Sequence, residues 1–182
     1  MTAADCVAAC IAALNQIGNP FMVVGSFSSN VYGVPRSTKD ADFVIKSADA
    51  IISKFAAAIG PSFVLEPQFA FETVTGTSRF HFTHADSGFI IEFFNLTDDP
   101  HDQQRFQRRV RGEIGGQSTY IPTAEDVIIT KLRWSKHGSR QKDIADIRGI
   151  LAVQKGRLNL EYIAEWADHH GTRDVLDPLL EE

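Results

Sequence analysis

The sequence is poor in cysteine, methionine and tryptophan, with two of each among 182 residues. Cys6 and Cys10 stand four positions apart, which places them on one face of a helix. We expect them to be small packing residues in a reducing compartment, and the alternative is a disulfide or a metal-binding pair. No Cys or His spacing matches a zinc site, and no phosphate-binding P-loop or Gly-x-Ser-x-Gly motif occurs.

A long apolar run is also absent. No segment approaches the roughly 18 consecutive apolar residues that a membrane-spanning helix needs, so we expect no contact with a membrane. The N-terminal segment contains Asp5 but no Lys or Arg before its apolar run, whereas a secretory signal begins with basic residues. These absences predict a cytoplasmic protein. Its length predicts one core, with or without a small helical extension.

Positive charge is not in excess, because the net charge is −5. This balance argues against a general affinity for nucleic acids. Nine of the 18 Lys and Arg residues nevertheless fall in one stretch: Arg105, Arg108, Arg109, Arg111, Lys131, Arg133, Lys136, Arg140 and Lys142. The stretch predicts a local basic patch for a phosphate-rich ligand. The alternative for the arginines from 105 to 111 is a solvated helix face.

The stretch from Phe21 to Ile45, FMVVGSFSSNVYGVPRSTKDADFVI, is the most informative part of the chain. An apolar strand breaks at Gly25-Ser26, a short helix follows, and a second strand begins at Asp40. Gly25 allows a tight turn from strand to helix. The free N–H groups at the start of that helix would bind an anion.

Alternation along the second strand places Asp40 and Asp42 on one face. The opposite, core-facing side would carry Ala41, Phe43 and Ile45. Two carboxylates this close repel each other unless a cation or strong donors hold them. The pair therefore predicts a site for a divalent metal ion, and the alternative is an acid-rich turn that enters a strand.

A third acid, Glu92, lies in the apolar run from Phe89 to Phe94. The segment from Arg79 to Phe94 is predicted to form a hairpin that turns at residues 86–88. An acid inside a buried strand is costly unless it is paired or bound to a metal. We therefore expect Glu92 to be the third carboxylate, and the alternative is an edge strand on which Glu92 faces water.

Gly25-Ser26 and Asp40-x-Asp42, separated by thirteen residues, resemble the signature of the nucleotidyltransferase superfamily related to DNA polymerase beta. The segment VVGSFSSNVYGVPRSTKDADFVI is most similar to the corresponding segment of bacterial minimal and AbiEii-like toxin nucleotidyltransferases. The resemblance implies transfer of a nucleoside monophosphate from a nucleoside triphosphate, with release of pyrophosphate. It also implies Mg²⁺, or Mn²⁺ in its place, held by Asp40, Asp42 and Glu92 as the catalytic acids; the family more often has Asp at the third position.

The same resemblance implies which residues bind the nucleotide. Gly25 and Ser26 would hold the triphosphate, and Lys131 or Lys142 would offset the charge of the leaving pyrophosphate. Lys131 matches a functional lysine of AbiEii-like relatives, and the alternative is that its side chain extends to solvent. The run Arg140-x-Lys142-Asp143-x-x-Asp146 resembles the helical region that follows the catalytic sheet in this family. Asp143 would orient Lys131 or Arg140, or else form ion pairs on a helix surface. Arg36 and Thr38 would orient the triphosphate, or else only form the turn.

The predicted fold class is α+β: a nucleotidyltransferase-type mixed sheet flanked by helices, with a C-terminal helical extension. Residues 1–122 would form the catalytic core and residues 123–182 a helical subdomain packed on it. Near the end of the catalytic core, we expect a helix from Asp102 to Val110 and a last hairpin around Gly115-Gly116. Thr123 is expected to cap the next helix, and Ser47 an earlier one.

The acceptor hydroxyl would belong to RNA, a protein or a small molecule, and the basic stretch favours RNA. The resemblance also implies a role in a toxin–antitoxin or abortive-infection system, with a cognate antitoxin as partner. The alternative function is a catalytically silent module of the same fold that binds a nucleotide or a partner protein.

Overall fold

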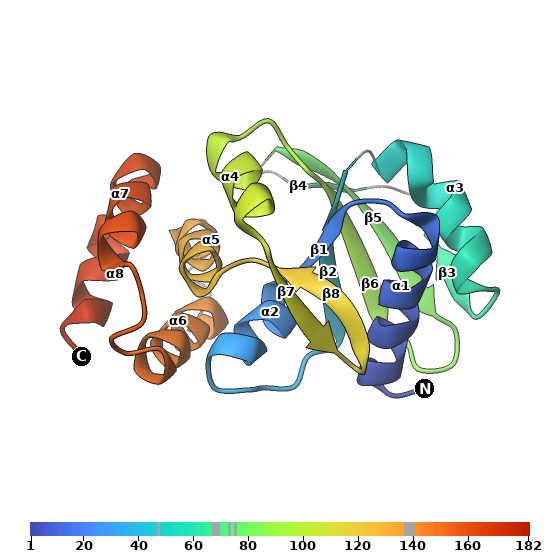
Figure 1. Cartoon of the computed structure of the whole chain (residues 1–182), viewed down its shortest axis with the longest axis horizontal. Coiled ribbons are helices and arrows are strands. Elements are labelled where there is room, and N and C mark those ends of the chain that lie inside the picture. The colour runs from blue at the N-terminus through green and yellow to red at the C-terminus, as the bar shows by residue number, and fades with distance from the viewer. Residues whose placement is uncertain (47, 67–69, 73, 75, 137–140) are drawn as a thin grey trace.

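The computed structural model describes the whole chain except residues 47, 67–69, 73, 75 and 137–140. Its helices and strands follow in this order (Figure 1): α1 (Ala3–Ile17), β1 (Phe21–Val24), α2 (Gly25–Tyr32), β2 (Asp40–Ile45), α3 (Ala48–Ile59), β3 (Phe63–Leu65), β4 (Ala70–Glu72), β5 (Thr77–His84), β6 (Ile90–Asn95), α4 (Pro100–Arg108), β7 (Val110–Ile114), β8 (Gln117–Ile121), α5 (Ala124–Lys136), α6 (Gln141–Val153), α7 (Leu160–His170) and α8 (Arg173–Leu180). The predicted cap at Ser47 lies outside the described residues.

The sheet has the order β1-β2-β6-β5-β3, and β4 also pairs with β5. β2 and β6 run parallel, whereas β1 with β2 and β5 with β6 are antiparallel pairs. The hairpin predicted from Arg79 to Phe94 is the β5–β6 pair. A mixed sheet between helices confirms the predicted α+β class.

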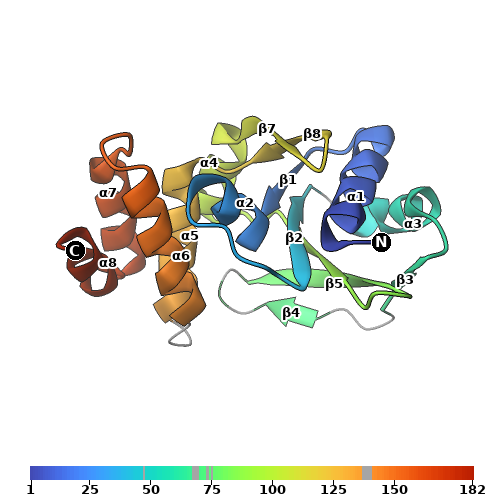
Figure 2. The same cartoon turned by 90° about the horizontal axis from the view of Figure 1, so that it is seen from below.

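One face of the sheet is buried under α1 and α3 (Figures 1 and 2). Alternation along β2 and β6 sends Phe43 and Phe93 into this core, where their ring centroids are 5.5 Å apart. Phe55 of α3 meets Phe93 edge-to-face at 4.7 Å. Cys6 and Cys10 of α1 are both 0% exposed and unpaired here, so the prediction of packing residues is confirmed.

The opposite face of the sheet is only partly covered. Val44 and Phe94 pack there with Phe106 of α4 and, less deeply, with Trp134 of α5. Because side chains alternate along a strand, the face that carries Val44 also carries Asp40 and Asp42. The uncovered part of this face is where the candidate site lies.

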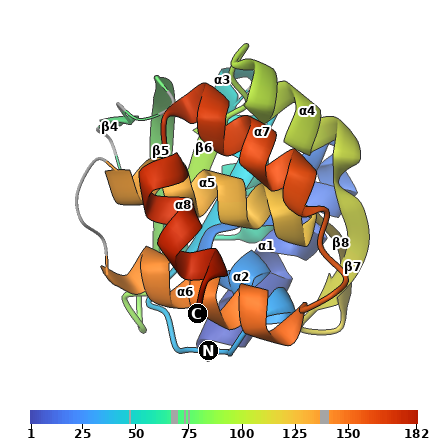
Figure 3. The ribbon, with the colours of Figure 1, turned by 90° about the vertical axis from the view of Figure 1, so that its left-hand side faces the viewer.

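Helices α5 to α8 share a separate apolar cluster, which contains Ile128, Leu132, Ile147, Ile163 and Leu176. Figure 3 shows α7 and α8 lying over α5 and α6. Tyr32 of α2 packs against this cluster as well as against the cluster under the sheet, and its hydroxyl donates to the carbonyl of Pro122 at 2.8 Å.

The prediction of a helix through Val110 is wrong at its C-terminal end. α4 begins at Pro100 and ends at Arg108, and Val110 already pairs with Ile121 in the β7–β8 hairpin. A β-branched side chain favours the extended backbone that this pairing requires. The turn at Gly115-Gly116 is confirmed, with positive φ at both glycines. Among the described residues, no helix has both the length and the apolarity that spanning a bilayer demands.

Candidate active site

Gly25 joins β1 to α2 with a φ of +62°, a region that favours glycine. A Cβ atom at this position would lie 1.9 Å from Asp42 Oδ2. The turn therefore needs glycine for two reasons, and its backbone lies directly against the Asp42 carboxylate. In the described part of the chain no side chain caps the N-terminus of α2, so its first N–H groups can bind an anion.

Three carboxylates gather on the same face of the sheet. Asp40 and Asp42 extend from β2, and the parallel register pairs Asp42 with Glu92 of β6. Burial raises the pKa of Asp42 well above its usual range, and the carboxylates of Glu92 and Asp40 raise it further. A cation placed among these acids would favour their charged forms.

The donor set fits a hard cation in type, because Mg²⁺ and Mn²⁺ prefer carboxylate oxygens. Among the described residues, however, no three His, Cys, Asp or Glu side chains stand in an arrangement that could hold a metal ion. Asp40 Oδ1 accepts a hydrogen bond from Thr38 Oγ1. Glu92 lies 3.1 Å from His81 Nε2 and 3.5 Å from Arg79 Nη1. Each carboxylate oxygen has two lone pairs, so these contacts leave acceptor capacity on Asp40 and Glu92 for a metal ion.

Beside the glycine turn lies a group of polar side chains that we call the cavity cluster: Ser26, Arg36, Lys131, Asp143 and Asp146. Arg36 donates from Nε to Asp146 Oδ1 at 2.7 Å, and from Nη2 to Asp146 Oδ2 and Ser26 Oγ at 2.9 Å each. Lys131 Nζ lies 2.7 Å from Asp146 Oδ2 and 3.1 Å from Asp143 Oδ1. Burial raises the pKa of Asp146, but hydrogen bonds from Arg36 and Lys131 hold it below its usual value.

One cavity of about 220 Å³ brings most of the predicted site residues together. Its lining includes Gly25, Ser26, Arg36, Asp40, Asp42, Glu92, Lys131, Lys142 and Asp143. Thr38 is joined to the site through Asp40, and Arg140 lies outside the described residues. Asp143 is 4% exposed, so the alternative of surface ion pairs is wrong for this residue.

No family model matches the sequence, and no curated protein matches it. Solved structures do. The solution structure of the antibiotic-resistance factor ANT(2'')-Ia matches with a TM-score of 0.64 and 14% identity over 95% of this chain and 93% of that one. The crystal structure of ANT(2'')-Ia in complex with adenylyl-2''-tobramycin matches with a TM-score of 0.65 and 15% identity, over 95% of this chain and 99% of that one. A nucleotidyltransferase-like protein from Paracoccidioides brasiliensis matches with a TM-score of 0.60 and 17% identity, over 98% of this chain and 92% of that one.

The chain has the nucleotidyltransferase fold. This confirms the fold that the resemblance of the glycine turn and paired acids implied. The similarity to AbiEii-like toxins in particular stays a prediction, as do the roles of the individual site residues. At these identities the likeness shows the fold alone.

Within this nucleotidyltransferase fold, three arginines of the basic stretch form ion pairs with aspartates. Arg105 Nε lies 2.9 Å from Asp102, Arg108 Nε lies 3.3 Å from Asp126, and Arg133 Nη1 lies 3.1 Å from Asp99. These arginines therefore do not form the open basic patch that the sequence predicted. Lys131 and Lys142 do reach the cavity.

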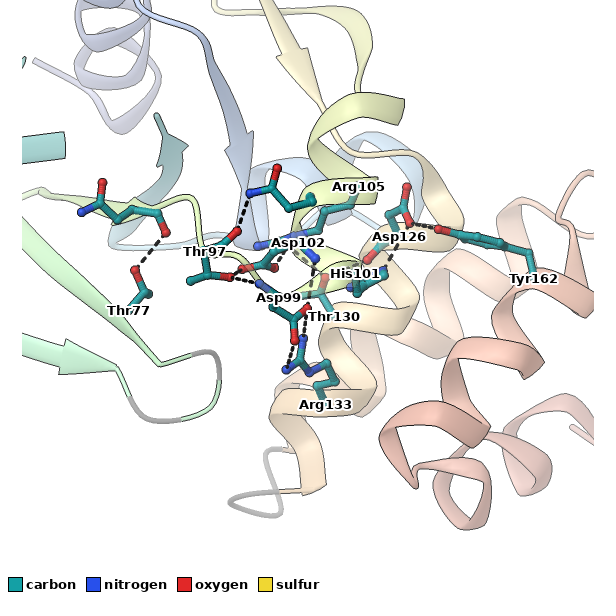
Figure 4. A network of polar contacts seen from close by, with 12 residues as sticks. Thr77, Thr97, Asp99, His101, Asp102, Arg105, Asp126, Thr130, Arg133 and Tyr162 are labelled. Carbon is teal, nitrogen blue, oxygen red and sulfur yellow. Dashed lines mark hydrogen bonds and ion pairs between the residues drawn. The ribbon is translucent and has the colours of Figure 1, made fainter. Parts of the chain in front are cut away.

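A second polar group joins α4, α5 and α7 around the buried side chains of His101 and Asp126. We call it the interior cluster: His101, Arg108, Thr123, Asp126 and Tyr162. Asp126 is 0% exposed. It accepts hydrogen bonds from the hydroxyls of Tyr162 at 2.8 Å and Thr123 at 2.9 Å. His101 Nε2 lies 3.3 Å away (Figure 4). No member of this cluster lines the cavity described above.

Sequence reasoning missed several residues of the cavity wall, among them Arg79, Asp102, Thr130 and Trp134. It also named Asp146 only as the last residue of the run Arg140-x-Lys142-Asp143-x-x-Asp146, although Asp146 contacts both Arg36 and Lys131. The signal for Asp146 was present, because a second acid beside an apolar helix stripe demands a partner. No comparable signal marked the other residues.

Proposed function

We propose that the protein is a Mg²⁺-dependent nucleotidyltransferase that moves a nucleoside monophosphate from a nucleoside triphosphate to an acceptor hydroxyl. The observation that carries this proposal is the contact of the Gly25 turn with Asp42, in a cavity that Arg36 and Lys131 also line. An anion site and a carboxylate site are therefore adjacent, as a metal-bound triphosphate requires. The fold shared with ANT(2'')-Ia, one structure of which holds adenylyl-2''-tobramycin, supports this reaction class.

Each part of the site has a role in this reaction. The N–H groups of α2 and the Ser26 hydroxyl bind the β- and γ-phosphates, and Arg36 and Lys131 offset the charge of the leaving pyrophosphate. Asp40, Asp42 and Glu92 would hold Mg²⁺, which when bound neutralises phosphate charge and makes the acceptor hydroxyl more acidic. Asp42 or Glu92 accepts the proton of that hydroxyl.

The other assigned residues support this arrangement. Thr38 orients Asp40, and Lys142, exposed beside the cavity, adds positive charge near the phosphates. Arg140, which lies outside the described residues, is proposed as a nucleotide-binding residue from the sequence resemblance alone. Asp143 orients Lys131 through its contact at 3.1 Å. We also propose residues 1–122 as the catalytic core and 123–182 as a helical subdomain.

The acceptor and the biological role belong to the same proposal. RNA, protein and small-molecule hydroxyls suit the chemistry, and the ion pairing of Arg105, Arg108 and Arg133 removes the reason for preferring RNA. A toxin–antitoxin role with a cognate antitoxin rests on the sequence resemblance.

The test is pyrophosphate release from labelled nucleoside triphosphates with Mg²⁺, in the presence of total RNA, cell protein extract or aminoglycosides. Labelling of one acceptor class is expected, and it identifies the acceptor. Asp42→Asn should lower turnover by about a thousandfold or more, because a carboxylate ligand and its charge are lost. Asp168→Asn is the matched control, since Asp168 is 67% exposed and far from the cavity lining.

Retained turnover in a folded Asp42→Asn protein would contradict this mechanism. Triphosphate binding that needs Mg²⁺ but releases no pyrophosphate with any acceptor would instead support the silent nucleotide-binding module.

A further inference from the structure

The cavity lining contains a second group of residues, which we call the inner part and which differs from the phosphate end. The phosphate end carries the glycine turn, Arg36 and Lys131, whereas the inner part combines apolar side chains with the Arg105–Asp102 pair. Its residues are Val44, Phe94, Asp102, Arg105, Thr130 and Trp134. The mechanism above assigns no role to any of them.

Trp134 is the central residue of this inner part. It follows Lys131 by three positions on α5, so the two side chains lie on the same helix face, about 4.5 Å apart along the axis. The Trp134 ring meets Phe94 edge-to-face, with centroids 6.3 Å apart and an interplanar angle of 84°. Trp134 therefore presents a partly exposed aromatic surface to the cavity, one helical turn from the lysine assigned to the phosphates.

Arg105 and Asp102 supply the polar wall of the inner part. Both are buried, at 6% and 3% exposure. Arg105 donates to Asp102 Oδ1 at 2.9 Å and to Thr130 Oγ1 at 3.2 Å, as Figure 4 shows. Fixed donors and acceptors beside an apolar surface discriminate among ligands by their hydrogen-bonding edges.

We infer that the inner part of the cavity binds the base of the nucleoside triphosphate, with Trp134 as the stacking surface. The inference rests on the proposed function. A ligand whose phosphates contact Lys131 places its next groups within reach of Trp134, and every nucleoside triphosphate carries a flat aromatic base. Apolar Val44 and Phe94 suit the faces of such a ring, and the Arg105–Asp102 pair suits its polar edge.

Fluorescence of the intact protein tests this directly. The chain has two tryptophans, and Trp166 of α7 packs on His101 away from the cavity lining. Each ribonucleoside triphosphate with Mg²⁺ and no acceptor is expected to change the tryptophan emission, whereas inorganic tripolyphosphate should bind without that change. The response should persist in Trp166→Phe and vanish in Trp134→Phe.

Binding constants from equilibrium dialysis complete the test. Trp134→Ala should weaken nucleoside triphosphate binding by about 5- to 150-fold, the range for losing one base–aromatic stack, and leave tripolyphosphate binding within about twofold. Trp134→Phe keeps an aromatic face and should retain most of the affinity, which guards against misfolding of the alanine variant.

Three outcomes overturn the inference. If nucleotide binds Trp134→Ala as tightly as it binds the wild-type protein, the base lies elsewhere while the proposed function stands. If the emission responds to an acceptor and not to nucleotide, the inner part is an acceptor subsite. If wild type binds neither nucleotide nor tripolyphosphate, the proposed function itself fails.

Discussion

The cavity cluster and the interior cluster are both built around a buried aspartate with polar partners, but they lie in different surroundings. Each centres on a buried aspartate, Asp146 or Asp126, that gathers partners from elements distant in sequence. Asp146 contacts Arg36 and Lys131 next to the glycine turn. Asp126 contacts Tyr162 and Arg108 where α4, α5 and α7 meet.

The two clusters are linked by one short sequence segment. Asp126 and Lys131 are five positions apart on α5, and the helix directs the first into the interior cluster and the second into the cavity. Buried polar contacts therefore do not by themselves mark a functional site. The neighbouring cavity and carboxylates distinguish the cavity cluster, and the comparison predicts that Asp126 stabilises the fold whereas Asp146 supports catalysis.

Among the variants that compare the two clusters, the largest effect is expected at the glycine turn that borders the cavity cluster. Gly25→Ala places a methyl group 1.9 Å from Asp42 Oδ2 and strains a positive φ. We expect turnover to fall at least a hundredfold, because either the turn or Asp42 must move. Gly88→Ala is the matched control, since Gly88 has a φ of +67° but nothing within 4 Å of an added Cβ.

The rate of pyrophosphate release per folded protein measures the loss of turnover. Thermal unfolding measures how much stability each variant loses by placing alanine at a positive φ. Gly88→Ala should cost about 1–2 kcal/mol of stability and leave turnover unchanged. Equal activities of the two variants would show that the contact between Gly25 and Asp42 is unimportant for catalysis.

Asp126→Asn should cause the largest loss of stability, about 3–5 kcal/mol in the free energy of unfolding. The change removes the charge that faces Arg108 and turns an acceptor oxygen of a 0% exposed side chain into a donor. Chemical denaturation measures the loss. Turnover below the unfolding midpoint should stay near that of wild type, and a lowered kcat with normal stability would contradict a purely stabilising role.

The sequence predicted those features that depend on local patterns. Alternation along residues 40–45 placed Asp42 opposite the core, and a single acid in an apolar run identified Glu92. The pairing of Arg36 with Asp146 joins residues 110 positions apart, and no local pattern specifies which helix will meet the turn. The basic stretch was misjudged for the same reason, because the acids that neutralise Arg108 and Arg133 come from other elements.

Asp146→Asn tests whether the aspartate of the cavity cluster supports nucleotide binding rather than stability alone. Removing its charge loosens Arg36 and Lys131 together, and loss of an orienting partner typically costs about 10- to 100-fold. We expect the KM for nucleoside triphosphate to rise by about that factor, with a smaller change in kcat. Asp146→Glu should recover part of the affinity. If Asp146→Asn lowered only stability, as Asp126→Asn should, the two clusters would be equivalent.

The smallest effect concerns pH and belongs to the region around the interior cluster. Burial, and after it the charge of Arg133, lower the pKa of His170 from 6.5 to about 4. Burial also lowers the pKa of His101, whose ring centroid is 5.4 Å from that of His170. Below pH 6.5 the unfolded chain binds protons that the folded protein excludes, so the free energy of unfolding should rise as pH increases from about 4 to about 6.5.

His170→Gln should reduce the slope of the free energy of unfolding against pH. His101 accounts for the part of the slope that remains. Denaturant unfolding at a series of pH values measures it, with His169→Gln, a change at the exposed neighbour, as the control. An unchanged slope in His170→Gln would mean that other groups titrate in this window. A reduced slope would locate acid sensitivity at the contact of α7 with α4, away from the carboxylates of the cavity.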